Sequence, residues 1–194
     1  MEWLFATHNE HKLREVQSFF PQGWLLRSLK DFQIHHVPKE SGDTLRQNAF
    51  IKWKAAAEAV SIPVFSEDTG LEVDALGGAP GVHTAVYAGE NAPADAHYLK
   101  LLEALKNEGD RTARFRTVIC YSLPGGGCAY AEGFCEGRIS TEVRGLKGFG
   151  YDPIFIPSGA EHSFAEMELD LKNSFSHRRK AFQDFLKKLN EMQP

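Results

Sequence analysis

Two adjacent acids, Glu67 and Asp68, follow a short, mostly apolar segment in the middle of this 194-residue chain. Residues 64–67 predict a strand, so we expect the acids at its end, where functional side chains are commonly placed. Together with an acid from elsewhere, such as Glu40, one of them could hold Mg²⁺ through oxygen atoms. A carboxylate there could also take a proton from an attacking water. An ordinary Asp-Thr-Gly turn is the alternative interpretation.

A polar segment, Thr7-His8-Asn9, lies between an apolar run at 2–7 and a helix that Asn9 can cap. A helix N-terminus offers free backbone N–H groups and a positive dipole end, which suit a phosphate group. Lys12 can add a positive charge, while Thr7 and Asn9 can add hydrogen bonds. The GxxxxGK[ST] pattern of a Walker A loop is absent. A capped helix with a surface lysine is the alternative.

Basic residues open the last expected helix, in the segment Ser176-His177-Arg178-Arg179-Lys180. Cations near a helix N-terminus oppose the macrodipole, at a cost of about 0.3–1 kcal/mol each. A cluster placed against this preference indicates an anion nearby, and Lys172 lies one expected turn before it. The alternative is a solvated basic face.

Two aromatic residues, Phe149 and Tyr151, stand among glycines and precede Asp152. Glycines let the backbone approach a ligand closely, and an aromatic face can stack on a nucleobase. A tight turn that buries Phe149 is the alternative. Combined with the acids and the cations, these residues supply the parts of a Mg²⁺-nucleotide site.

Composition limits the classes of protein that fit. Hydrophobic residues form 42% of the chain and charged residues 25%, which is typical of a soluble globular protein and excludes disorder and fibrous folds. A formal net charge of −4 disfavours a nucleic-acid partner. The three cysteines form no CxxC pair, so we expect a reducing, cytoplasmic location without disulfides or a zinc ribbon. Neither a transmembrane helix nor a signal peptide is expected, and hence no membrane partner.

The hydrophobic pattern predicts the elements that must position these residues. Helices are expected to begin at Asn9 and Ser176 and to cover about 45–60 and 94–107. Thr44 and Gln47 have the spacing of a capping box. Strands are expected at 2–7, 24–29, 64–67, 112–123, 128–135, 138–143 and 153–156. Helices mixed with a long hairpin predict an α/β or α+β fold with a mixed sheet.

Motifs along nearly the whole chain resemble the inosine triphosphate pyrophosphatase family, also called XTP/dITP diphosphatases or non-standard purine nucleoside triphosphate pyrophosphatases. The pair LGGAPG and GFGYDP is specific in combination. The matching segments are Ala6-Thr7-His8-Asn9 with Lys12, Glu40-Ser41-Gly42, Asn48-Ala49 with Lys52 and Lys54, SEDTGL at 66–71, VDALGGAPG at 73–81, GFGYDP at 148–153 and SHR at 176–178.

The resemblance implies an α/β fold, with a long mixed β-sheet and helices in two lobes around a central cleft, in one domain over 1–194. It implies Mg²⁺-dependent hydrolysis of purine triphosphates such as ITP, dITP and XTP. The α–β linkage is cleaved to give the monophosphate and pyrophosphate, which cleanses the nucleotide pool. It also implies a homodimer.

The same resemblance assigns roles to particular residues. Glu40 and Asp68 bind Mg²⁺, and Asp68 is the catalytic proton acceptor, although a role only as metal ligand fits the sequence equally. The substrate residues that it implies are Thr7, His8, Asn9 and Lys12 for the triphosphate, Thr69 beside Asp68, Phe149, Gly150, Tyr151 and Asp152 for the base-stacking wall, and Lys172, His177 and Arg178 for reading the base.

Two residues depart from the family pattern. His8 stands where the family usually has Gly, so it would narrow the phosphate loop or add a donor. Val86 follows LGGAPG where many bacterial relatives have Arg. These departures leave open a nucleotide sensor without turnover. A pyrophosphatase of altered base specificity, acting on Maf-like substrates, is a third hypothesis.

Overall fold

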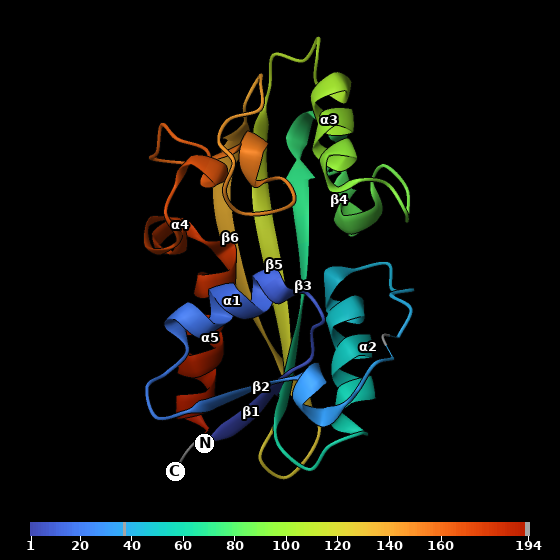
Figure 1. Cartoon of the computed structure of the whole chain (residues 1–194), viewed down its shortest axis with the longest axis vertical. Coiled ribbons are helices and arrows are strands. Elements are labelled where there is room, and N and C mark those ends of the chain that lie inside the picture. The colour runs from blue at the N-terminus through green and yellow to red at the C-terminus, as the bar shows by residue number, and fades with distance from the viewer. Residues whose placement is uncertain (37, 193–194) are drawn as a thin grey trace. The chain divides into compact units, whose positions relative to one another are not determined.

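A computed structural model describes residues 1–36 and 38–192, and this part of the chain contains both strands and helices (Figure 1). The strands are β1 (Glu2–Phe5), β2 (Leu25–Ser28), β3 (Val64–Val73), β4 (Pro80–Gly81), β5 (Thr112–Ser122), β6 (Cys128–Ile139) and β7 (Phe155–Pro157). The α-helices are α1 (Glu10–Phe19), α2 (Leu45–Ala57), α3 (Ala94–Ala104), α4 (Leu169–Phe175) and α5 (His177–Glu191).

The strands pair in the order β2-β1-β3-β5-β6-β7, and β4 pairs with β3. β1 is parallel to both of its neighbours, with Glu2 opposite Leu25 and Leu4 opposite Val64. α1 connects β1 to β2 and α2 connects β2 to β3, as parallel strands require a crossover. β4 and β7 are antiparallel to β3 and β6. The predicted α/β fold with a mixed sheet is therefore confirmed.

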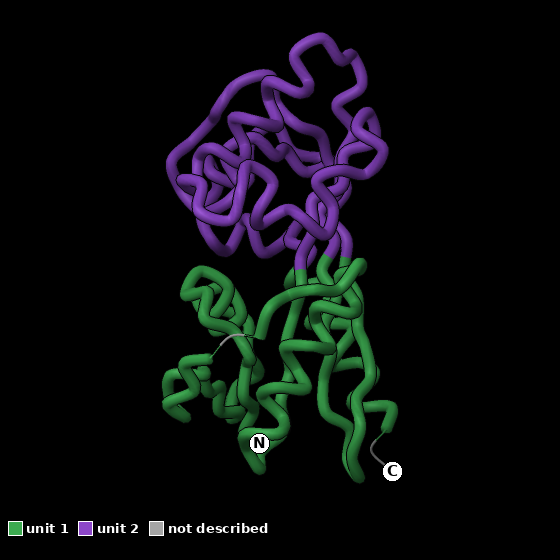
Figure 2. The backbone as a smooth tube through the Cα atoms, turned by 90° about the vertical axis from the view of Figure 1, so that its right-hand side faces the viewer, with its two compact units in different colours: residues 1–68, 117–133, 178–194 green, residues 69–116, 134–177 purple. Residues whose placement is uncertain are grey.

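The chain forms two compact units, which Figure 2 distinguishes by colour. Unit 1 comprises residues 1–68, 117–133 and the C-terminal stretch from Arg178, and unit 2 comprises residues 69–116 and 134–177. β3, β5 and β6 each contribute residues to both units. The single domain and the central cleft implied by the resemblance stay predictions.

In unit 1, the two faces of the strands carry different helices. Phe5 and Phe65 stack at 4.6 Å between ring centroids, and both lie in a cluster with Phe182 of α5 and residues of α1. Val64 instead packs in a separate cluster with Ala56 of α2. Successive strand residues point to opposite faces. In the unit 1 part of β3, the Phe65 side chain therefore lies on the face of α1 and α5, and the Val64 side chain lies on the face of α2.

Unit 2 has its own core, in which α3 packs against β3, β5 and β7. Leu101 of α3 is fully buried together with Leu71 of β3. Phe115 and Phe155 contact each other at 4.7 Å between ring centroids, and Phe164 extends this aromatic group. This core supports the segment that carries the glycine-rich aromatic motif.

The local capping predictions are confirmed. Asn9 is the N-cap of α1, and its Oδ1 accepts hydrogen bonds from the backbone N–H groups of His11 and Lys12. Thr44 and Gln47 form the capping box of α2. That helix ends at Ala57, earlier than expected. Cys120 lies in β5 and Cys128 in β6, and the three cysteines are free.

The expectation that Glu67 and Asp68 end a strand is wrong. Both lie inside β3, which continues through the Asp-Thr-Gly segment to Val73. Pairing holds the backbone extended on both sides of the acids, with Phe65 opposite Phe5 and Leu71 opposite Gly81. The tertiary context overrides the turn preference of these residues.

Other strand boundaries also differ from expectation. The strands expected at 128–135 and 138–143 are one strand, β6, which ends at Ile139. A Cβ atom at Gly137 would lie 2.4 Å from the Ile156 carbonyl oxygen, so this glycine permits the close approach of β7 and does not break the strand. β7 begins at Phe155 because Asp152–Ile154 forms a 3₁₀ turn, and α4 was not anticipated.

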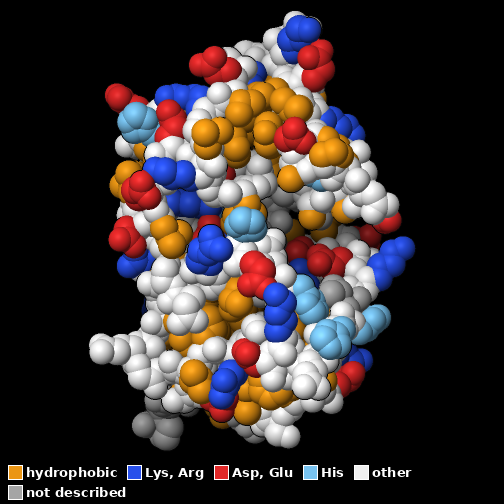
Figure 3. Space-filling view, in the orientation of Figure 1, with side chains coloured by type: hydrophobic (Ala, Val, Ile, Leu, Met, Phe, Trp, Pro, Cys, Tyr) orange, Lys and Arg blue, Asp and Glu red, His pale blue; other side chains and the backbone are white. Residues whose placement is uncertain are grey.

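The helices and one face of the molecule bear on the expected partners. Within residues 1–36 and 38–192, no helix combines the length and hydropathy that crossing a membrane requires. On the face shown in Figure 3, acidic and basic side chains are interspersed. The expected absence of nucleic-acid and membrane partners stays a prediction.

One hydroxyl in unit 1 joins three elements, and this yields a test of the packing. Ser122 Oγ accepts hydrogen bonds from Trp53 Nε1 at 3.0 Å and from the Val64 backbone N–H at 3.1 Å. Ser122→Ala leaves both donors unsatisfied, so we expect a loss of about 1–3 kcal/mol in the free energy of unfolding by urea. Ser174→Ala, at an exposed hydroxyl, is the control. Equal stability of the two variants would contradict this account.

Candidate functional site

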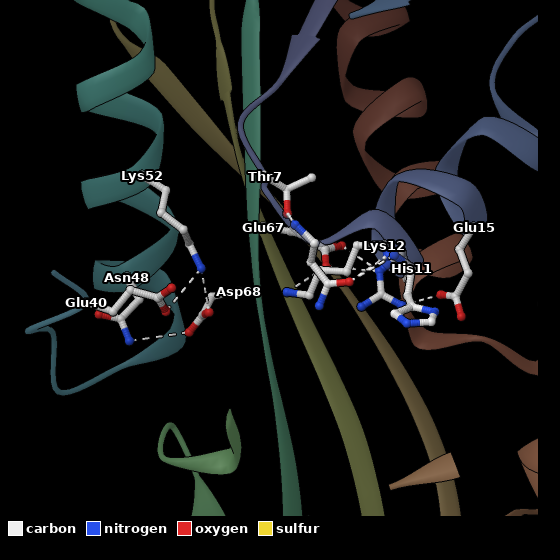
Figure 4. Close-up of polar contacts among 11 residues, drawn as sticks. Thr7, His11, Lys12, Glu15, Glu40, Asn48, Lys52, Glu67 and Asp68 are labelled. Carbon is white, nitrogen blue, oxygen red and sulfur yellow. Dashed lines mark hydrogen bonds and ion pairs between the residues drawn. The ribbon is translucent and has the colours of Figure 1, made fainter. Parts of the chain in front are cut away.

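Asp68 lies at the centre of a polar cluster in unit 1, formed with Glu40, Asn48 and Lys52 and called here the Asp68 cluster (Figure 4). Lys52 Nζ is 2.7 Å from Asp68 Oδ1 and 3.2 Å from Glu40 Oε2. Asn48 Nδ2 donates to Asp68 Oδ2 at 3.4 Å. The Asp68 side chain is 9% exposed and that of Glu40 is 42% exposed, so the cluster runs from the interior to the surface.

α2 and the loop before it position this cluster. Asn48 and Lys52 are four residues apart, so they lie on one face of α2. Asn48 Oδ1 accepts a hydrogen bond from the Gly42 backbone N–H at 2.8 Å, which ties the loop carrying Glu40 to the helix. A Cβ atom at Gly42 would lie 2.6 Å from Gln47 Cβ, so this contact requires glycine. The loop geometry and the helix therefore bring Glu40 toward Asp68.

The electrostatics of the cluster favour an additional cation. Burial raises the pKa of Asp68, and Glu40 raises it further, while Lys52 and Lys12 lower it without reversing the net upward shift. The ionised form of Asp68 is therefore incompletely compensated by the protein's own positive charges.

The donor set of the Asp68 cluster fits Mg²⁺. Glu40 and Asp68 supply carboxylate oxygens, which Mg²⁺ prefers, and Mg²⁺ commonly uses one or two carboxylates together with substrate phosphates. Among the described residues, no group of three or more His, Cys, Asp or Glu side chains could hold a metal by itself. A metal there would thus depend on further oxygen ligands from a substrate or from water.

A second set of charged side chains lies on the opposite face of β3, and we call it the Arg178 network. Arg178 Nε donates to both carboxylate oxygens of Glu67 at 2.9 Å, and Nη1 donates to Glu15. Lys12 Nζ is 3.1 Å from Glu67 Oε1. The Arg178 and Glu67 side chains are each 2% exposed. The structure therefore neutralises the cation of Arg178 with acids of its own chain.

This network shows what the sequence interpretation missed. Glu67 and Asp68 are consecutive in a strand, so their side chains point to opposite faces and serve different clusters (Figure 4). Glu15 and Lys52 were given no role from the sequence, and Glu67 was considered only as a metal ligand or proton acceptor beside Asp68. Two signals in the sequence were available. The alternation of side chains in β3 separates Glu67 from Asp68, and the i, i+3 spacing in α1 places Lys12 and Glu15 on one face of that helix.

The loop before α1 uses its polar side chains locally. Thr7 Oγ1 accepts a hydrogen bond from the Asn9 backbone N–H at 3.1 Å, and Asn9 Oδ1 caps the helix. The Nε2 atom of His8 is buried and has no hydrogen-bond partner. Lys12 extends from the first turn of α1 to Glu67, as Figure 4 shows. The loop and the Arg178 network thus share Lys12.

In unit 2, Asp152 joins the glycine-rich aromatic motif to α4. Its Oδ2 atom accepts hydrogen bonds from Lys172 Nζ at 2.5 Å and from the Phe149 backbone N–H at 2.8 Å. Lys172 Nζ lies 5.0 Å from the centroid of the Phe149 ring, within cation–π range. Tyr151 is buried, and its hydroxyl donates to the Thr84 carbonyl at 3.0 Å. Asp152, Lys172 and Phe149 form what we call the Phe149 cluster.

The remaining predicted residues of unit 2 are Gly150, His177 and Thr69. Gly150 has a φ of +60°, which only glycine adopts readily. His177 opens α5 and stacks on Phe115 with 4.6 Å between ring centroids. Thr69 is partly buried in β3. The substrate and metal roles of these residues, and of those in unit 1, stay predictions.

Comparison with known proteins agrees with this fold and with the motifs. A model of the Ham1 family matches residues 3–188. The dITP/XTP pyrophosphatases of Christiangramia forsetii and Bacillus subtilis are 48% and 42% identical to this chain, over 98% of it in both cases and over 100% and 96% of their own lengths. The solved structure of the Staphylococcus aureus Ham1 protein is 35% identical, covers 100% of both chains and has a TM-score of 0.87.

The architecture is thus that of a Ham1-type α/β protein. The chain belongs to the Ham1 family, and the resemblance found in its motifs is confirmed.

The Arg178 network predicts an acid-sensitive contribution to stability. Burial raises the pKa of Glu67, but Arg178 and Lys12 lower it more, so the net pKa is below the ordinary value of 4.5. This stabilisation is fully present above pH 4.5 and is lost as the pH falls through the lower pKa of the folded protein. Glu67→Gln should lose about 3–5 kcal/mol near pH 7 and show a flatter acid dependence in urea unfolding.

Glu58→Gln, at an exposed helix end, is the matched control for Glu67→Gln and should keep the parental acid profile. An unchanged acid slope in Glu67→Gln would show that Glu67 is not the titrating group.

Two glycines allow a matched test of the Phe149 cluster. Gly148 has a φ of +73°, and a Cβ atom there would lie 2.0 Å from Asp152 Oδ2. Gly125 has a φ of +89°, and a Cβ atom there would meet nothing within 4 Å. Gly148→Ala should therefore lose about 1–3 kcal/mol more than Gly125→Ala in thermal unfolding. Equal losses would mean that backbone strain alone accounts for both.

Proposed function

We propose that this chain hydrolyses non-standard purine nucleoside triphosphates, namely ITP, dITP and XTP, to the monophosphate and pyrophosphate. Family membership and the names of the 48% and 42% identical relatives support this reaction. The observation that carries it is the Asp68 cluster, where two carboxylates and a lysine converge at a site that lacks full positive compensation. The substrate brings the phosphate oxygens that the donor set needs.

Asp68 and Glu40 would hold Mg²⁺, which when bound neutralises charge on the phosphate oxygens and polarises them. Asp68 also orients or deprotonates the attacking water. Its buried position and its hydrogen bond to Asn48 hold the carboxylate in place for that role. Asn48 fixes one oxygen of Asp68 through its 3.4 Å hydrogen bond. Phosphoryl transfer depends mainly on such positioning and charge neutralisation.

The loop before α1 would receive the triphosphate. The positive end of the α1 dipole, the charge of Lys12 and the hydroxyl of Thr7 are suited to phosphate oxygens. The unsatisfied Nε2 of His8 gives this loop an additional polar atom where relatives carry glycine. Asn9 contributes through the cap that shapes the loop, and Thr69 follows Asp68 in β3.

The Phe149 cluster would recognise the base. Phe149 offers a ring for stacking, and Gly150, Tyr151 and Asp152 complete that wall. Lys172, whose ammonium group donates to Asp152, would donate to the 6-oxo group of hypoxanthine or xanthine. Adenine has an amino group at that position and would leave the donor unsatisfied. His177 and Arg178 would contribute to this recognition, and Arg178 would do so from a buried position.

The biological setting proposed for this reaction is cleansing of the cytoplasmic nucleotide pool by a homodimer. The free cysteines are compatible with the reducing cytoplasm. Sedimentation of the purified chain measures the oligomeric state directly.

The reaction is tested by pyrophosphate release from ITP, XTP, GTP and ATP, with Mg²⁺ and with a chelator. We expect Mg²⁺-dependent release from ITP and XTP, and little from GTP or ATP. Asp68→Asn should lower kcat by about 10²–10⁴-fold because it removes the proton acceptor and a metal ligand. Asp95→Asn, at an exposed position of α3, is the control.

Full activity of Asp68→Asn would reject the catalytic assignment. Tight binding of ITP by calorimetry without pyrophosphate release would instead identify a nucleotide sensor.

A further inference from the structure

Lys52 lies between the two carboxylates that the proposed function assigns to a metal ion. Its Nζ atom contacts Asp68 Oδ1 at 2.7 Å and Glu40 Oε2 at 3.2 Å, as the close-up in Figure 4 shows for the ion pairs of this cluster. The Lys52 side chain is 11% exposed, so its ammonium group is held within the cluster. One oxygen of each carboxylate is therefore already paired with a cation of the chain itself.

We propose that Lys52 is an internal counter-ion that keeps divalent metal out of the Asp68 cluster until a nucleotide binds. Metal and triphosphate then enter as a coupled pair. This inference rests on the proposed function because it concerns the same site, and it adds the order in which the site is filled.

Competition follows from the geometry of the two cations. Mg²⁺ contacts its oxygen ligands at about 2.0–2.1 Å. An ammonium group that shares the same two oxygens would lie close to the metal, and two positive charges at short range in a partly buried site repel each other strongly. The metal and the Lys52 ammonium therefore exclude each other from these oxygens. For a metal to bind through these two oxygens, the Lys52 ammonium must leave them.

In the absence of nucleotide, electrostatic attraction holds Lys52 at Asp68. Asp68 is largely buried, and Lys52 is the nearest cation that compensates its charge, since Lys12 pairs with Glu67 on the other face of β3. A triphosphate changes this balance because its oxygens offer the ammonium an alternative negative partner. The lysine stem is flexible enough to follow that partner. By linkage, a nucleotide that withdraws Lys52 raises the affinity for metal, and metal raises the affinity for nucleotide equally.

The charge count predicts the effect of removing the lysine. Glu40, Asp68 and Lys52 together carry a net charge of −1, whereas Glu40 and Asp68 alone carry −2. Lys52→Met and Lys52→Gln should thus bind metal more tightly than the parent when nucleotide is absent. Lys52→Arg keeps the positive charge and should bind metal as weakly as the parent.

The experiment is a titration of the full chain with Mn²⁺, followed by electron paramagnetic resonance, with and without α,β-methylene-ITP. Lys54→Met is the matched control, since Lys54 lies on the same helix but is 59% exposed and pairs only loosely with Glu58 at 3.9 Å. Removal of Lys52 takes away one of the groups that lower the pKa of Asp68. The titration is therefore done at pH 8, so that Asp68 is ionised in the neutral variants as well. Circular dichroism verifies that each variant is folded.

We expect the analogue to increase the Mn²⁺ affinity of the parent at least tenfold. Without the analogue, Lys52→Met and Lys52→Gln should bind Mn²⁺ at least tenfold more tightly than the parent. The analogue should increase their Mn²⁺ affinity by a smaller factor than it does for the parent. Lys52→Arg and Lys54→Met should match the parent. If both neutral variants are folded and bind Mn²⁺ no better than the parent, the inference is overturned. Absence of Mn²⁺ binding in every protein would overturn it as well.

These outcomes are separate from the test of the proposed function. Gained Mn²⁺ affinity in the neutral variants, in a parent protein that releases no pyrophosphate, would support the counter-ion and reject the hydrolase. Pyrophosphate release by the parent, together with unchanged Mn²⁺ affinity in the neutral variants, would support the hydrolase and reject the counter-ion.

Discussion

Two carboxylates at consecutive positions of a buried strand each need a positive partner on their own face of the sheet. β3 meets this requirement with different chemistry on its two sides. Glu67 is held by Arg178 and Lys12, and their attraction exceeds the effect of burial on its pKa. Asp68 has Lys52 as its positive partner and the partly exposed Glu40 as an acidic neighbour. The effect of burial therefore exceeds the attraction of the lysine, and the pKa of Asp68 rises. One face is therefore electrostatically satisfied, whereas on the other the charge of the ionised carboxylate is only partly compensated.

Local features of the fold could be predicted from the sequence because their causes lie within a few residues. The Asn9 cap and the Thr44 capping box depend on neighbouring backbone groups, and both formed as expected. The end of β3 could not be predicted in this way. Its acidic segment has the composition of a turn, but pairing on both sides and distant cations keep it extended.

The site was predictable in its residue types but not in its partnerships. Asp68 and Glu40 were singled out by chemistry and motif, whereas the partner of Glu67 lies 111 residues away in the sequence. Arg178 also reaches Glu15, which is 163 residues away. No spacing rule connects positions so far apart, because the fold alone determines which charges meet. The basic segment at the start of α5 indicated an anion, and for Arg178 the structure supplies that anion from the chain itself.

The single oxygen of Asp152 that accepts from both Phe149 and Lys172 has a consequence for how this protein can change over evolution. An aromatic ring and a charged donor that share no partner can be exchanged one at a time. Here a substitution of Lys172 also alters the anchor of the Phe149 loop, and a shift of that loop alters the anchor of the lysine. Divergence in this region therefore requires concerted replacements, which restricts the mutational routes open to it.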